Sequence, residues 1–188
     1  MAHDPDRTRS LLMGAAVREF GEHGYSGARI ERISRSAGVN RERLYSYFGD
    51  KRRLFETVLA DRLSTVLDTT PVRGSGPEAV AAFAAAYFDA CLEASDVPRL
   101  VVWEGLELQR PIEVESRRVQ ADLKVEEIRA ALPGSTKEQA ENLLLTIVTL
   151  CHGWFTTPNL GRIIAGDESA HGRRRGEVVA VARLMASR

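Results

Sequence analysis

Apolar residues recur at three- and four-residue spacing along most of the 188-residue chain, and this helical period constrains the fold more than any other feature. Leu12, Ala16 and Phe20 form one such stripe, and Ile33 and Ala37 belong to another. No segment alternates between apolar and polar residues as a half-buried strand does. The pattern therefore predicts an all-α protein.

Capping residues and breakers divide the first part of the chain into short helices. Gly21 and Gly24 are expected to stop the first helix, Gly38 ends the second, and Asn40 is a good N-cap for the third. The predicted helices cover about 6–22, 28–37, 41–47 and 51–68. The second and third, joined by the turn at Gly38, form a helix-turn-helix candidate.

A second group of helices follows a Gly- and Pro-containing segment at 69–77, which is the best hinge candidate. These helices are expected at about 78–95, 98–110, 113–132, 136–156 and 174–187, with a loop at about 157–173 that holds one short helical turn near 160–165. We therefore predict an N-terminal three-helix domain, residues 1–50, and a larger C-terminal helical domain, residues 51–188. The helix at 51–68 connects the two.

The formal net charge of zero conceals a basic block. Residues 29–53 contain eight Lys or Arg against three Asp or Glu. A local positive patch on a neutral protein favours a polyanion-binding surface.

The basic block coincides with the helix-turn-helix candidate. In this motif the second helix enters the DNA major groove with its N-terminal residues toward the base edges, and Arg41, Glu42 and Arg43 occupy that end. Arg can pair with guanine and Glu can accept from cytosine. Tyr45 and Tyr47 are placed to give hydroxyl bonds to phosphate, and so is the ammonium of Lys51 at the next helix start.

The run from Arg9 to Leu59 resembles the DNA-binding domain of the TetR family of transcriptional regulators. The resemblance is carried by Ala16, Phe20, Gly24, Tyr25, Ile33, Ala37, Gly38, Val39, Leu44, Tyr45, Tyr47, Phe48, Lys51 and Leu54. It implies a ligand-responsive regulator, most often a repressor released from a palindromic operator by a small molecule. The predicted DNA-binding residues are Arg29, Asn40, Arg41, Glu42, Arg43, Tyr45, Tyr47 and Lys51.

Two positions depart from the family pattern. Ala28-Arg29 stands where Thr or Ser usually opens the second helix, which weakens the cap but offers the charge of Arg29 to phosphate. Ser34 replaces the usual alanine after Ile33. Neither departure disturbs the predicted recognition helix.

Residues 140–155 are apolar on almost every face, so we expect them to be covered by their own domain on one side and by a partner on the other. The resemblance implies a homodimer in which the last two long helices of each subunit form a four-helix bundle. Such a dimer would read a double-stranded DNA palindrome. The predicted interface residues are Leu144, Val148, Cys151, Val178, Val181, Leu184 and Met185.

The middle helices are expected to enclose an effector site, because aromatic residues with few polar groups typify small-ligand pockets. The predicted effector residues are Tyr87, Phe88, Trp103, Glu104, Glu107, Trp154 and Phe155. Glu104 and Glu107 beside Trp103 would suit a flat, cationic ligand. The alternative is that the two glutamates are exposed and the tryptophans belong to the core.

Two other classes of function were weighed. Glu168-x-x-His171 matches half of a di-iron motif, but such sites need two copies, and adjacent Cys151 and His152 point to different helix faces. We therefore predict no enzyme activity, metal or cofactor. A protein-interaction module that kept the helix-turn-helix without binding an operator stays a second alternative. No apolar run reaches the roughly 18 residues of a membrane span, and the N-terminus lacks a signal peptide, so a cytoplasmic protein is expected.

Overall fold

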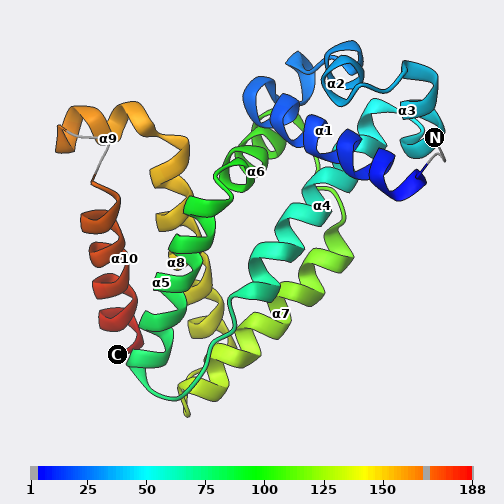
Figure 1. Ribbon diagram of the computed structural model, residues 1–188. Helices are drawn as coiled ribbons and strands as arrows, with labels where there is room; N and C mark the ends of the chain where they lie inside the picture. The colour runs from blue at the N-terminus through cyan, green and yellow to red at the C-terminus, as the bar shows by residue number, and fades with distance from the viewer. Residues whose placement is uncertain (1–3, 167–169, 188) are drawn as a thin grey trace. The chain divides into compact units, whose positions relative to one another are not determined.

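The computed structural model describes residues 4–166 and 170–187, and within these ranges the chain forms ten helices and no strand (Figure 1). The helices are α1 Pro5–Gly27, α2 Ile30–Ala37, α3 Arg41–Phe48, α4 Lys51–Thr69, α5 Pro77–Glu93, α6 Asp96–Glu107, α7 Val114–Ala131, α8 Lys137–Thr156, α9 Pro158–Ala165 and α10 His171–Ala186. The all-α prediction is confirmed. The expected loop after α8 contains the whole of α9.

The first helix extends further than predicted. It runs through Gly21 and is interrupted only at Gly24, where φ is 69° and ψ is −176°, before a last turn ends at Gly27. Gly24 can adopt this positive φ because glycine does so without steric cost, whereas Gly21 keeps helical geometry. Only the second of the two predicted stops therefore breaks the helix.

The chain packs as two compact units. The first comprises the chain through Arg62 together with Arg99–Glu113, and so contains α1 to α3, most of α4 and most of α6. Phe20 and Phe55 meet edge to face in its core, with ring centroids 4.9 Å apart. A helix as short as α3 is marginal in isolation, so the burial of Leu44 and Phe48 in this core stabilises it.

The second unit comprises Leu63–Pro98 and the chain from Val114 onward. Phe83, Phe88 and Ile147 are among the side chains buried in its core. Helix α10 lies along α5 (Figure 1), and the guanidinium of Arg175 makes two hydrogen bonds of 2.7 and 2.8 Å to the carboxylate of Asp89. This unit also buries both cysteines, Cys91 and Cys151, as free thiols.

We predicted a functional boundary after residue 50, but the first packing unit continues through Arg62. Leu54 and Phe55 of α4 are fully buried, and the part of α4 that carries them packs with the first three helices. The assignment of DNA binding to 1–50 and of effector binding to 51–188 stays a prediction. Over the described ranges, no helix is both long and apolar enough to cross a membrane.

Candidate nucleic-acid interface

Two local features set the start of α3. Gly38 adopts the left-handed conformation, φ 66° and ψ 28°, and ends α2 there. The side chain of Asn40 then accepts a hydrogen bond of 2.9 Å from the backbone N–H of Arg43. Because Leu44 and Phe48 are buried on the inner face of α3, Arg41 and Glu42 remain exposed at its N-terminal end. The predicted base-reading residues thus occupy the position that the motif requires.

Arg41 is engaged with two protein partners. Its Nη2 donates to the hydroxyl of Tyr45 at 3.1 Å, and its Nη1 lies 2.8 Å from Oε1 of Glu31 on α2. The hydrogen bond to Tyr45 and the attraction of Tyr45 and Glu31 raise the pKa of Arg41. Glu31 therefore competes with any base or phosphate for the guanidinium of Arg41.

The two predicted phosphate-contacting tyrosines differ in their hydrogen bonds. The hydroxyl oxygen of Tyr45 accepts from Arg41, so its own O–H is left to donate to a phosphate. The hydroxyl of Tyr47 donates to the carbonyl of Pro5 at 3.2 Å. Tyr47 can therefore reach a phosphate as a donor only by leaving Pro5.

The start of α4 is capped by Asp50, whose Oδ1 accepts from the N–H of Arg53 at 2.8 Å. Lys51 directs its ammonium to the carbonyl of Ser26 at 3.3 Å and lies 4.9 Å from the ring centroid of Tyr25. Burial lowers the pKa of Lys51, and attraction to Glu107 and Glu19 offsets this only in part. Lys51 is therefore held against the C-terminal end of α1.

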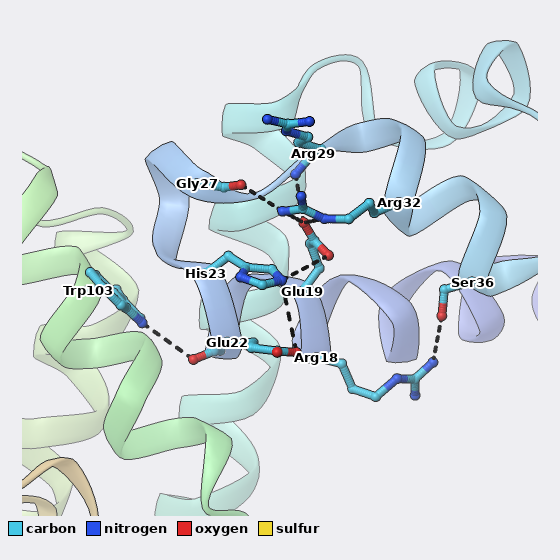
Figure 2. Close-up of polar contacts among 10 residues, drawn as sticks. Arg18, Glu19, Glu22, His23, Gly27, Arg29, Arg32, Ser36 and Trp103 are labelled. Atoms are coloured by element: carbon cyan, nitrogen blue, oxygen red, sulfur yellow. Dashed lines mark hydrogen bonds and ion pairs between the residues drawn. The ribbon is translucent and has the colours of Figure 1, made fainter.

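The start of α2 is capped by a residue of another helix. Arg29 is the N-cap residue and its side chain makes no capping bond, as its departure from Ser or Thr predicted. Instead Oε1 of Glu19 on α1 accepts the backbone N–H of Arg29 at 2.8 Å (Figure 2). The side chain of Arg29 itself stays exposed.

The same carboxylate binds Arg32, whose Nε donates to Glu19 at 2.7 Å and whose Nη2 donates to the carbonyl of Gly27 at 2.8 Å (Figure 2). Burial raises the pKa of Glu19, but the hydrogen bonds from Arg32 and Arg29 and the charge of Arg32 outweigh it, so the pKa lies below its ordinary value. Sequence reasoning missed this network. An acidic residue beside Phe20, on the apolar side of the first helix, is the signal that could have revealed it.

Three predicted effector residues lie in α6 within the first unit and are engaged with its own backbone. Trp103 Nε1 donates to the carbonyl of Gly21 at 3.4 Å, and Glu107 Oε2 accepts the N–H of Ser26 at 2.8 Å. Glu104 is buried, and its Oε1 accepts the N–H of Ile112 at 2.8 Å. The alternative that both glutamates are exposed is wrong, because Glu104 is buried and Glu107 is half-buried.

The other four predicted effector residues lie in the second unit. Tyr87 and Phe88 are buried in α5, and the Tyr87 hydroxyl lies 2.9 Å from Nε2 of His152. Phe155 packs on Phe88 with ring centroids 5.3 Å apart, and Trp154 Nε1 donates to Nδ1 of His171 at 2.7 Å. These four residues therefore form one contiguous aromatic region of α5 and α8.

A small cavity of about 140 Å³ is also found in the second unit. It is lined by Leu67, Asp68, Gln120, Leu123, Lys124 and Glu127. It contains none of the predicted effector residues, and pockets for drug-sized ligands are typically at least about 300 Å³. The cavity therefore does not identify an effector site.

The predicted dimer residues divide into two groups. Leu144, Cys151 and Val178 are buried in the core of their own unit, which corrects their assignment to a partner-facing surface. Val148, Val181 and Met185 are half-buried, and Leu184 is 60% exposed. Leu145, which was not predicted, is 62% exposed on α8. The face of α8 that carries Leu144 and Cys151 packs inward, and the face that carries Leu145 is exposed.

The Glu168-x-x-His171 match was not predicted to bind metal, and Glu168 lies outside the described residues. Among the residues that the structure describes, no three His, Cys, Asp or Glu side chains are arranged to hold a metal ion.

An all-α chain with a capped helix-turn-helix and a basic recognition helix belongs to the class of helical DNA-binding regulators. The model of the family described as bacterial regulatory proteins, tetR family, matches residues 12–58, and that of the tetracyclin repressor-like C-terminal domain matches residues 79–183. The chain belongs to the TetR family. It is a ligand-responsive, DNA-binding transcriptional regulator and not an enzyme.

Individual relatives agree with this assignment. The HTH-type transcriptional repressor SCO4008 of Streptomyces coelicolor is 31% identical over 180 residues, covering 90% of this chain and 89% of its own length. The repressor NicS of Pseudomonas putida is 47% identical over 58 residues, 31% of this chain and 27% of its own. The crystal structure of the regulator SCO4942 from Streptomyces coelicolor matches with a TM-score of 0.78 and 25% identity, over 95% of this chain and 97% of that one.

Proposed function

We propose that the chain is a cytoplasmic repressor that binds a palindromic operator as a homodimer and leaves it when a small molecule binds. The observation that carries the proposal is the exposed N-terminal end of α3, where Arg41 and Glu42 stand on a helix anchored by buried Leu44 and Phe48. The names of its relatives, which are repressors, support the direction of control. The proposed DNA-contacting residues are Arg29, Asn40, Arg41, Glu42, Arg43, Tyr45, Tyr47 and Lys51.

The test of DNA binding is selection from a random duplex pool, followed by a salt titration of the selected sequence. A protein that contacts six to ten phosphates loses about 10³- to 10⁵-fold in affinity between 50 and 200 mM salt. A palindromic selected sequence with that salt dependence supports the proposal. An absence of any retained duplex at low salt would favour the protein-interaction alternative.

The proposed dimer uses exposed apolar residues of α8 and α10, with Leu145 and Leu184 as its main contacts and Val148, Val181 and Met185 beside them. A two-fold dimer would present two α3 helices to half-sites about one helical turn apart. Leu145→Glu and Leu184→Glu should give monomers in sedimentation equilibrium. Leu106→Glu, at a leucine that is 72% exposed on α6, is the matched control and should leave the dimer intact.

The proposed effector region is narrowed to Tyr87, Phe88, Trp154 and Phe155. Glu104 and Glu107 already bind backbone amides, so a cationic ligand loses the carboxylates that would have recognised it. An apolar or aromatic small molecule is therefore the better match to this region. Compounds that release the selected operator should also change the fluorescence of Trp154, measured in a Trp103→Phe background.

A further inference from the structure

Lys51, the proposed phosphate contact at the start of α4, is positioned by two residues in the last turn of α1, Tyr25 and Ser26. Its ammonium donates to the carbonyl of Ser26 at 3.3 Å, and the ring of Tyr25 lies beneath it at 4.9 Å from the centroid. A lysine side chain has many rotamers and loses that freedom when it is ordered. These contacts restrict it before DNA arrives, provided that Ser26 itself stays in place.

Ser26 is held from its other side by α6. The carboxylate of Glu107 accepts the N–H of Ser26 at 2.8 Å, although the two residues are 81 positions apart. The two bonds fall on either side of one Cα atom, with the N–H of Ser26 bound to Glu107 and its carbonyl bound to Lys51. A charge-assisted bond of this kind is roughly twice as strong as a neutral one.

Helix α6 also packs closely against α1 at Gly21 and Gly24. Gly24 has φ of 69°, and a Cβ there would lie 2.8 Å from the ring of Trp103 and 2.9 Å from Oε1 of Glu107. Figure 2 shows Trp103 directed at α1, where the carbonyl of Gly21 accepts from Trp103 and, at 2.8 Å, from Nε of Arg99. The approach requires a glycine at 24 and fixes Glu107 against the following turn.

We propose that Glu107 is a positioning residue for DNA binding, acting through Ser26 to hold Lys51 where it meets a phosphate. The inference rests on the proposed function, and it makes α6 a direct support of one DNA anchor. A change that draws Glu107 away from Ser26 frees the turn and disorders Lys51. Attraction between Glu107 and Lys51 acts in the same direction, and it opposes the burial that lowers the pKa of Lys51.

Two conservative variants separate the hydrogen bond from the charge. Glu107→Gln keeps an acceptor for the Ser26 N–H and removes the charge, whereas Glu107→Asp keeps the charge and withdraws the acceptor by one methylene. We expect Glu107→Asp to lose about tenfold in affinity for the selected operator, and Glu107→Gln to lose less, because it keeps an acceptor and removes only the charge. The opposite order would show that Glu107 acts by charge alone and would overturn the proposal.

A double-mutant cycle tests the route through Lys51. Lys51→Ala should reduce the salt slope of binding by about 0.9, as expected for one lost phosphate contact, and Glu107→Asp should reduce it partly. In the Lys51→Ala background, Glu107→Asp should cost less than twofold. A full tenfold loss in that background would overturn the proposal, because Glu107 would then act independently of Lys51.

Glu56→Ala is the matched control, because the carboxylate of Glu56 pairs with Arg52 on α4 at 2.9 Å. Its effect should be the same with and without Lys51→Ala. Thermal unfolding of each variant checks that the fold is kept. If wild-type protein retains no duplex at all, the proposed function fails. If wild type binds an operator but the effects of Glu107→Asp and Lys51→Ala are additive, only the role of Glu107 fails.

Discussion

The carboxylate of Glu19 on α1 accepts the backbone N–H of Arg29, the first residue of the turn into α2, at 2.8 Å. Arg29 has no capping side chain of its own, and the Glu19 bond is the one that a Glu or Gln three residues into the helix makes to the N-cap N–H in a capping box. The helix-turn-helix is therefore attached to α1 by a polar contact as well as by its apolar core. The attachment fixes the start of α2 relative to the helix that supports it.

Replacing Glu19 by Ala should lower the free energy of unfolding by about 1–3 kcal/mol, because it leaves the Arg29 N–H and the Arg32 guanidinium without their buried acceptor. The measurement is urea denaturation followed by circular dichroism. Glu22→Ala is the control, since the side chain of Glu22 is 72% exposed. Equal effects of the two substitutions would show that the Glu19 network contributes no stability.

Replacing Ser34 by Ala should stabilise the protein by about 1 kcal/mol. The hydroxyl of Ser34 is buried and finds no hydrogen-bond partner among the described residues. Alanine removes that unsatisfied group and is the better helix former. A drop in melting temperature for Ser34→Ala would mean that the hydroxyl has a partner in solution.

Replacing Glu31 by Gln should raise the affinity for unrelated duplex DNA by up to about fivefold, because an exposed ion pair is worth about 0.2–1 kcal/mol and Glu31 competes with phosphate for Arg41. Fluorescence anisotropy with a scrambled duplex measures this gain. Glu56→Gln removes the same charge from an Arg–Glu pair on α4 and controls for reduced repulsion. The expectation fails if both variants gain equally.

Replacing Arg43 by Ala should cost about 1–3 kcal/mol on the selected operator and relax the preference at one base pair of each half-site. Lys51→Ala is the comparison, because loss of a phosphate contact weakens binding to all sequences alike. The measurement is repeated selection from the random pool with each variant. An unchanged consensus for Arg43→Ala would remove Arg43 from base reading.

Stability should fall as the pH is lowered from about 6.5 to about 4, through His152. Burial lowers the pKa of this imidazole to about 4 from 6.5, so in that window the unfolded chain takes up a proton that the folded chain does not. Each unit of pKa difference is worth 1.36 kcal/mol, which gives a loss of up to about 3 kcal/mol that is complete below pH 4.

His152→Gln, which keeps a polar partner for Tyr87, should flatten this dependence in urea titrations between pH 7.5 and 4.5. His23→Gln is the control, because it removes a histidine that is half-buried, whereas His152 is buried. A pH profile that His152→Gln leaves unchanged would exclude His152 as its source.

Much of the helix-turn-helix could be predicted from the sequence. The helical period, Gly38 and Asn40 predicted α2, the turn and α3, and the structure has these elements with the expected left-handed glycine and side-chain cap. Gly24 was expected to break α1 and does, although Gly21 does not. These capping and glycine signals act between residues a few positions apart, so they can be recognised in the sequence.

The faces of α8 and α10 were harder to predict. Leu144, Cys151 and Val178 were expected at a partner surface and lie in the core, while Leu145 lies exposed. When a helix is apolar nearly all round, its composition does not say which side faces inward. The packing of α5 and α7 against these helices decides that.

By itself the sequence determined the helical class, the position of the helix-turn-helix and the residues at the exposed end of α3. Only the tertiary structure decided that Glu19 caps α2, that Glu107 supports the turn holding Lys51, and that Glu104 binds a backbone amide. The reason is that helix formation and capping depend on near neighbours. A buried carboxylate instead takes whichever donor the packing of distant helices brings within about 3 Å of it.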